Sequence, residues 1–187
     1  MRMGNKKSLN INQITLCALF TALIAVGAFI KIPLPAVPFT LQFLFTNLAG
    51  LLLGKRLGSI SVAVYIAVGL AGLPIFAAGG GPAYIFQPTF GYVLGYLPGT
   101  YAAGYIMEKS HPKTYRIRLI ASFANFAIVY ALGVGYYYLI ANYYLNSSIG
   151  VWAIILHCFI LPLPGRIILC ITSASLSQRL TPIMRRG

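Results

Sequence analysis

Acidic side chains are nearly missing from this sequence: Glu108 is the single Asp or Glu among 187 residues, against 14 Lys and Arg. Charged residues amount to 8% of the chain and hydrophobic residues to 59%, which is a membrane composition rather than a soluble one. In a soluble protein the formal charge of +13 would suggest a nucleic-acid partner. Here the cations flank apolar runs and no GxxxxGK[ST] motif occurs, so we expect contact with membrane lipid and none with nucleic acid.

Cysteine and histidine are also scarce, and their placement offers little for catalysis. Cys17, Cys158 and Cys170 lie inside apolar runs at irregular spacing, which indicates packing rather than disulfides or a metal site. His111 and His157 have no carboxylate partner, and the sequence shows no nucleophile–base pair and no cluster of metal ligands. We therefore expect no enzyme activity, no cofactor and no metal.

What the chain does contain is a succession of apolar runs separated by short polar or Pro- and Gly-rich segments. The first run is long enough to cross a hydrocarbon core of about 30 Å as a helix. The sequence therefore predicts an all-α membrane protein, a six-transmembrane-helix bundle that forms a single integral membrane domain over residues 1–187. The expected crossings are approximately 13–30, 39–53, 57–72, 91–107, 117–141 and 151–176.

The distribution of Lys and Arg orients these crossings. Twelve cations belong to the termini or to the even-numbered connections, whereas the odd-numbered connections hold only Lys31. By the positive-inside rule both termini are then cytoplasmic, including the segment 1–10 and the basic tail 180–187. The connections 31–38, 72–90 and 142–150 are expected outside. The twelve cations are Arg2, Lys6, Lys7, Lys55, Arg56, Lys109, Lys113, Arg116, Arg118, Arg179, Arg185 and Arg186.

One stretch, GLPIFAAGGGPAYIFQPTFGYVLGYLPG at 72–99, lies between apolar runs but cannot be one plain helix. Three consecutive glycines at 79–81, followed by Pro82 and Pro88, remove helix propensity and backbone donors. At membrane depth, non-helical backbone is tolerated where protein buries it or where it lines a cavity. The alternative, a flexible external loop, would expose the apolar side chains of Phe76, Ile85, Phe86 and Phe90 to water.

Arg166, in the motif PLPGR, is the cation within a predicted crossing. It lies 13 residues before Arg179, or roughly 20 Å along a helix, which places it in the outer half of the membrane. A lone arginine there costs at least about 2.5 kcal/mol, and no intramembrane carboxylate is available to pair with it. We expect its partner to be a ligand carboxylate. In the alternative, Arg166 snorkels or bonds carbonyls freed by Pro162 and Pro164.

The proline-rich outer loops and PLPGR converge on one face, where they form a candidate pocket with a few polar groups in an apolar wall. Taken singly, each candidate is more often a packing or interfacial residue. The pocket candidates are Thr40, Gln42, Gly80, Gly81, Tyr84, Gln87, Thr89, Phe90, Tyr92 and Arg166.

Small residues recur at helical spacing in the first predicted helix, at Ala18, Ala22 and Ala25. Such a stripe lets another helix approach closely. The spacing alone does not distinguish a partner interface from packing within the bundle.

Four motifs resemble the BioY family, the biotin-binding S components of energy-coupling factor (ECF) transporters: PLPAVPFTLQ, AGLLLGKRLG, GLPIFAAGGGPAY and PTFGYVLGY. The resemblance implies six helices, an outward pocket roofed by the first and third loops, and a vitamin ligand. It also implies a transmembrane scaffold subunit and two cytoplasmic ATPases as partners, in a prokaryotic cytoplasmic membrane. The family's Ala-x-x-x-Ala surface toward the scaffold falls on Ala18 and Ala22.

Two departures from the family pattern concern the ligand. Where the family usually has Asp and, three residues on, Lys after the proline-glycine of the last helix, this chain has Arg166 and Leu169. Phe90 replaces a glycine of the family pattern. Loss of the acid and gain of a ring fit a carboxylate ligand with a smaller, less polar head, such as lipoate, whereas membership favours biotin. Rivals of other classes are an integral membrane enzyme acting on lipid and a non-transport membrane scaffold.

Overall fold

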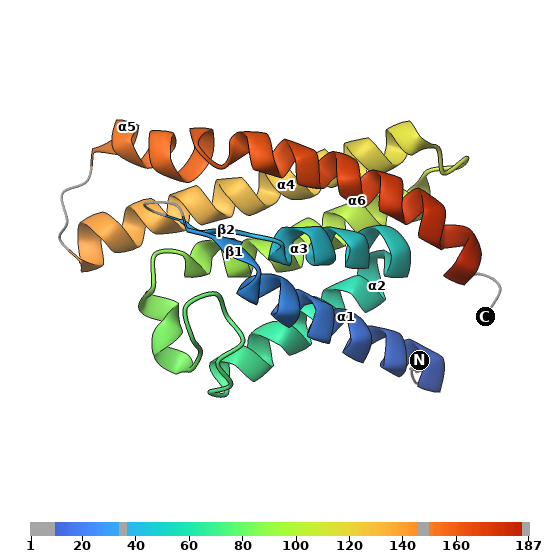
Figure 1. Cartoon of the computed structure of the whole chain (residues 1–187), viewed down its shortest axis with the longest axis horizontal. Helices are drawn as coiled ribbons and strands as arrows, with labels where there is room; N and C mark the ends of the chain where they lie inside the picture. The colour runs from blue at the N-terminus through green and yellow to red at the C-terminus, as the bar shows by residue number, and fades with distance from the viewer. Residues whose placement is uncertain (1–9, 34–36, 146–149, 185–187) are drawn as a thin grey trace, which may run out of the picture.

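The computed structural model describes residues 10–33, 37–145 and 150–184 and is mostly helical over them (Figure 1). Short strands, a 3-10 turn and two π-helical turns interrupt or extend the α-helices. The α-helices are α1 (Ile11–Phe29), α2 (Gln42–Leu70), α3 (Phe90–Lys109), α4 (Tyr115–Leu139), α5 (Val151–Ile154) and α6 (Leu163–Met184). The remaining elements are β1 (Lys31–Ile32), β2 (Phe39–Thr40), the 3-10 turn η1 (Pro82–Phe86) and the π-turns η2 (Ile140–Tyr144) and η3 (Ile155–Ile160).

Helix α1 begins at a reciprocal cap. The Asn10 side chain accepts a hydrogen bond from Ile11 N at 2.7 Å, and Asn10 N donates to Gln13 Oε1 at 3.1 Å. These two bonds satisfy donors that the helix itself leaves unpaired. The helix therefore starts slightly earlier than the run 13–30 that the sequence predicts.

Helix α2 is broken at Gly54, whose φ of 80° and ψ of −178° are not helical. The chain turns back there, so the two halves of α2 run in opposite directions (Figure 1). A Cβ at Gly54 would lie 2.6 Å from Glu108 Oε1, and one at Gly58 would lie 2.8 Å from the Ala49 carbonyl oxygen. The two halves match the separate runs 39–53 and 57–72 predicted on either side of a basic turn.

That turn is held by the one acidic residue of the chain. Glu108, at the end of α3, accepts from Lys55 N at 3.0 Å and pairs with Lys55 Nζ at 3.3 Å. The pair is more than a third exposed, so its ionic part contributes little to stability. The backbone hydrogen bond fixes where α3 meets the turn.

Four stretches of the described residues are long and apolar enough to cross a membrane: Ile11–Phe29, Gln42–Leu70, Tyr115–Tyr144 and Trp152–Ile183. Helix α3 is not one of these four stretches, and it contains several glycines, several tyrosines and Pro98. Its glycines bring it close to α4, since a Cβ at Gly95 would lie 2.9 Å from Val129 Cα. Thus α3 packs between α2 and α4.

A layer of polar side chains joins α2, α4 and α6 in the interior. We call Asn47, Ser122, Asn125 and Ser173 the polar seam; all four are fully buried. Asn47 Nδ2 donates to Ser173 Oγ at 2.6 Å, and Asn125 Nδ2 donates to Asn47 Oδ1 at 3.1 Å. The seam crosslinks three helices that are distant in sequence.

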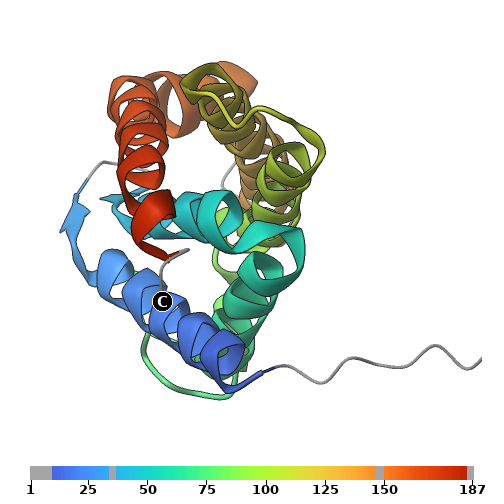
Figure 2. The same cartoon turned by 90° about the vertical axis from the view of Figure 1, so that its right-hand side faces the viewer.

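The start of α1 and the end of α6 lie at the same end of the molecule (Figure 1), and α1 lies along one side of the bundle (Figure 2). Several cations used for the predicted orientation lie outside the described residues, namely Arg2, Lys6, Lys7, Arg185 and Arg186, as do most of the segment 1–10 and part of the tail 180–187.

Candidate ligand-binding site

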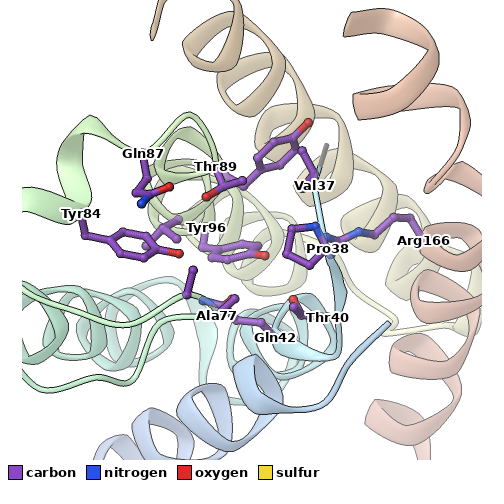
Figure 3. Close-up of a pocket in the computed structure, with 13 residues that line it drawn as sticks. Val37, Pro38, Thr40, Gln42, Ala77, Tyr84, Gln87, Thr89, Tyr96 and Arg166 are labelled. Carbon is purple, nitrogen blue, oxygen red and sulfur yellow. The ribbon is translucent and has the colours of Figure 1, made fainter. Parts of the chain in front are cut away.

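A cavity of about 120 Å³ lies where the first residues of α2, α3 and α6 meet two loops (Figure 3). Arg166 reaches into this region from the first turn of α6. The cavity is lined by Val37, Pro38, Thr40, Gln42, Ala77, Ala78, Tyr84, Gln87, Thr89, Tyr92, Val93, Tyr96 and Arg166.

The β-hairpin after α1 positions one wall. Strands β1 and β2 are antiparallel, with Lys31 opposite Thr40, and Thr40 lies two residues before Gln42, the first residue of α2. Gln42 Nε2 donates to the Tyr65 hydroxyl at 2.9 Å, and that hydroxyl donates to the Ile75 carbonyl at 3.0 Å. These two hydrogen bonds therefore fix the orientation of the Gln42 amide at the cavity wall.

The glycine-rich stretch folds back on itself to form the opposite wall. Phe76 and Gly79 exchange two backbone hydrogen bonds of 2.8 and 3.2 Å, and Gly81 N donates to Gly69 O at 2.7 Å. Gly79 and Gly81 have φ of 117° and 96°, which favour glycine over other residues. Lys31 Nζ donates to the Ala77 carbonyl at 2.8 Å and ties this loop to the hairpin.

Burial of the ring of Phe76 anchors that stretch. Phe76 is 1% exposed and its ring centroid lies 4.6 Å from that of Tyr84. The sequence argument that the loop hides its apolar side chains is right for Phe76 and Phe90 but wrong for Ile85 and Phe86, which are exposed. Phe86 instead stacks on Tyr144 in η2, with centroids 4.9 Å apart.

Seven of the residues singled out in the sequence lie together on the cavity wall: Thr40, Gln42, Tyr84, Gln87, Thr89, Tyr92 and Arg166. Burial raises the pKa of the Tyr84 phenol, so at neutral pH this group is protonated and able to donate a hydrogen bond.

Gly80, Gly81 and Phe90 do not line this cavity, in contrast to their assignment from sequence. Gly80 packs on the loop backbone, since a Cβ there would lie 2.0 Å from Leu73 O. Phe90 is buried against Phe76, Tyr84 and Tyr136, with ring centroids 6.1 to 6.4 Å away.

Sequence reasoning missed Tyr96 among the wall residues. Tyr96 follows Tyr92 by four residues, which places both on one face of α3, and this spacing was a usable signal. Val37, Pro38, Ala77, Ala78 and Val93 carry no comparable signal, because small apolar residues are common everywhere in this chain.

Arg166 is enclosed by aromatic rings. The side chain is 2% exposed, and its guanidinium carbon lies 5.4 Å from the Phe39 ring centroid, 5.2 Å from that of Phe43 and 5.8 Å from that of Tyr130. These distances permit cation–π attraction, which strengthens when the cation is desolvated. Such burial does not fit the alternative in which Arg166 snorkels to the membrane surface.

Two guanidinium nitrogens of Arg166 are left unsatisfied. Its Nε and Nη1 are buried and have no hydrogen-bond partner among the residues that the structure describes. Proline-freed carbonyls therefore do not take up these two donors. A buried unpaired donor is costly, so an acceptor arriving in the adjoining cavity is strongly favoured.

The first helix presents two of its three small residues outward. Ala18 and Ala22 are exposed, together with Ile14, whereas Ala25 is half-buried and packs against the core. The three alanines lie on one face of α1, as their spacing requires, and this face is open at Ala18 and Ala22 and partly covered by the core at Ala25. Of the three, Ala25 is the one that packs against the core of the bundle.

Fold and cavity together define a class, an α-helical membrane protein with a loop-roofed pocket at one end of its bundle. The BioY family model matches residues 3–186, and this chain belongs to the BioY family. It is a multi-pass membrane protein. The resemblance noted from the sequence motifs is thereby confirmed.

Individual relatives agree with this membership. The chain is 43% identical over 173 residues to the probable biotin transporter BioY of Lysinibacillus sphaericus, covering 92% of this chain and 88% of that protein. It is 40% identical over 138 residues to the biotin transporter BioY of Thermotoga maritima, covering 73% and 78% respectively. The crystal structure of the S component for biotin from an ECF-type ABC transporter matches with a TM-score of 0.78 at 25% identity, covering 96% of this chain and 94% of that one.

Proposed function

We propose that this chain is the substrate-binding S component of an ECF-type importer, and that it captures biotin or a closely related carboxylate vitamin from outside. Family membership and the names of its relatives support this function. The observation that carries the ligand chemistry is Arg166, a buried cation beside a cavity with two unsatisfied donors. A carboxylate supplies both the opposite charge and acceptors for a guanidinium fork.

In this proposal the other wall residues bind the vitamin head. Thr40, Gln42, Tyr84, Gln87, Thr89 and Tyr92 offer hydroxyl and amide groups that both donate and accept. The hairpin and the glycine-rich stretch form the roof, since Pro38 and Ala77 come from these two loops. Gly80 and Gly81 contribute by shaping the loop rather than by lining the cavity.

The test compares two ligands that differ only at the carboxylate. For the purified protein we expect Arg166→Gln to weaken biotin binding by at least about tenfold, because a charge-assisted hydrogen bond is lost. Binding of biotin methyl ester, which has no negative charge, is expected to change much less. Isothermal titration measures both affinities for both proteins.

A matched control is Arg116→Gln, which removes an exposed cation at the start of α4 that is not part of the cavity wall. It should leave both affinities as in the wild type. Equal affinity of the wild-type and Arg166→Gln proteins for biotin would remove Arg166 from the site. The absence of any saturable small ligand would instead favour the non-transport membrane scaffold.

A second candidate ligand is lipoate. No acidic residue lines the cavity among the described residues, and the chain's single acid is bonded to Lys55, so a ureido N–H finds no carboxylate here. The argument from Phe90 loses its support, because that ring lies outside the cavity wall. Titration with biotin, dethiobiotin and lipoate ranks the three.

We further infer six crossings with both termini in the cytoplasm. The reversal of α2 at Gly54 and the shared end of α1 and α6 support this count, together with the cations in the cytoplasmic connections. A transmembrane scaffold subunit would dock on α1 at Ala18 and Ala22. ATP hydrolysis would belong to two cytoplasmic ATPase subunits.

A further inference from the structure

The wall of the vitamin cavity holds a side-chain amide whose two ends are not interchangeable. Gln42 is 3% exposed and lines the cavity, and its Nε2 donates to the Tyr65 hydroxyl at 2.9 Å. That hydroxyl in turn donates to the Ile75 carbonyl at 3.0 Å. An amide has a donor end and an acceptor end of nearly the same shape, so the hydrogen bonds around it decide which end a ligand meets.

The direction of these two hydrogen bonds follows from the Ile75 carbonyl. A carbonyl oxygen only accepts, so the single hydroxyl proton of Tyr65 is used there. The hydroxyl then has only lone pairs to offer Gln42, which must present its NH2 group to it. No described residue donates to Gln42 Oε1, yet this atom is not one of the fully enclosed unpaired polar atoms. The acceptor end of Gln42 is therefore open to the cavity.

Packing holds the Tyr65 side chain in place. Tyr65 is fully buried in the second half of α2, and its ring centroid lies 5.4 Å from that of Phe76 in an edge-to-face contact. Gln87, the second side-chain amide on the wall, differs, because no described residue bonds its side chain. Gln87 can turn either end toward a ligand, whereas Gln42 is fixed as an acceptor.

We propose that Tyr65 is a positioning residue that fixes the polarity of Gln42, and that the cavity thereby selects a ligand head with an N–H group. This inference rests on the proposed function and narrows its choice of ligand. The cyclic urea of biotin and dethiobiotin carries N–H groups, whereas the dithiolane of lipoate has none. A head without an N–H leaves a buried acceptor unpaired, which is costly. An amide oxygen thus takes the place of a carboxylate as the partner of a ureido N–H.

The test measures the affinities of the purified full chain for biotin, dethiobiotin and lipoate by isothermal titration. The wild-type protein should bind both ureido ligands more tightly than lipoate. Tyr65→Phe keeps the buried ring and deletes the hydroxyl, which frees the Gln42 amide to turn. We expect this variant to bind biotin and dethiobiotin about tenfold more weakly and lipoate less than about twofold more weakly, because only the ureido ligands lose an acceptor.

A double-mutant cycle tests whether Tyr65 acts through Gln42. Gln42→Leu removes the acceptor and should lower the affinity for biotin at least as much as Tyr65→Phe does. In the Gln42→Leu protein, the further change Tyr65→Phe should have little effect on biotin binding, since two residues of one hydrogen-bonded unit are not additive. Additive losses would overturn the positioning role.

The matched control is Tyr136→Phe. The Tyr136 hydroxyl also donates to a carbonyl of the glycine-rich stretch, that of Ile85, but Tyr136 is not part of the cavity wall. Its affinities for all three ligands should equal those of the wild type. The inference is overturned if Tyr136→Phe weakens biotin binding as much as Tyr65→Phe, or if Tyr65→Phe weakens lipoate and biotin equally, since either result indicates a general effect on the loop.

The wild-type affinities separate this inference from the function on which it rests. Binding of lipoate as tightly as biotin, or more tightly, overturns the selection of an N–H group and leaves the capture of a carboxylate vitamin standing. Binding of none of the three ligands overturns both.

Discussion

At the scale of single residues, buried polar side chains hold this apolar chain in one arrangement. Asn47 uses both ends of its amide, donating to Ser173 in α6 and accepting from Asn125 in α4. Hydrogen bonds of this kind between helices are specific in direction, unlike contacts between leucines. The polar seam therefore selects the register of three helices against one another.

We predict that Asn47→Leu destabilises the protein by about 1–2 kcal/mol, the upper part of the range for such bonds inside membranes. The loss arises because Asn125 Nδ2 and Ser173 each lose a partner at a fully buried position. Unfolding in mixed detergent, followed by circular dichroism, measures the change.

Gln178→Leu is the control, because Gln178 is an exposed polar residue on α6. It should leave the free energy of unfolding within a few tenths of a kcal/mol of the wild type, as surface substitutions usually do. If Asn47→Leu were equally neutral, the seam would not contribute to the choice of register.

From the sequence, an individual residue can be singled out as a site candidate only where its type is unusual for the run in which it lies. Arg166 is conspicuous as a cation in an apolar run, and the structure buries it beside the cavity. Asn47 and Asn125 gave no such signal, because an isolated amide is less unusual in an apolar run. Ile85 and Phe86 were misjudged because the sequence does not reveal how much of a loop faces outward.

At the scale of elements, the sequence locates breaks better than it describes their geometry. Gly54 and the following Lys55 and Arg56 predicted a turn between two helices, and a reversal occurs there. The π-turn η3 was not predicted, since it depends on tertiary contacts such as the 3.0 Å bond from the Tyr92 hydroxyl to the Cys158 carbonyl. Local propensity does not encode such contacts.

Helix α1 provides the test of the partner surface. We expect Ala22→Trp to abolish copurification with a scaffold subunit, because a bulky side chain on the exposed face prevents close helix packing. Vitamin affinity of the isolated chain should remain as in the wild type. Pull-down of the scaffold from membranes that contain the whole transporter measures assembly.

Ala131→Trp serves as the matched substitution, since Ala131 is an exposed alanine on α4 and α1 packs chiefly on α2. It should leave assembly intact. Full assembly with Ala22→Trp would place the scaffold on another face of the bundle.

At the scale of the whole molecule, composition and charge placement predicted an α-helical membrane protein, and family membership agrees. The number of membrane crossings is harder to count from the helices. Helix α3 is rich in glycine and tyrosine, and α2 is one continuous element that contains two apolar runs. The cavity walls could not be listed fully from sequence, since they combine residues from the starts of three helices and two loops.

The orientation of the bundle is testable by cysteine labelling in intact cells. A membrane-impermeant maleimide should label Lys31→Cys directly but Arg56→Cys only after permeabilisation, because the two positions lie on opposite sides of the membrane in our proposal. The native Cys17, Cys158 and Cys170 are buried, which keeps the background low. Labelling of Arg56→Cys in intact cells would reverse or reject the proposed orientation.

The short hairpin after α1 has a mechanical consequence. It connects the last turn of α1 to Thr40 and Gln42 on the cavity wall. From the same hairpin, Lys31 donates a hydrogen bond to the Ala77 carbonyl in the opposite loop. In the function proposed above, a scaffold subunit that displaces α1 would therefore also displace the hairpin and its tie to the opposite loop at the cavity. Under that proposal, movement of a single peripheral helix would be enough to separate the two loops that cover the bound vitamin.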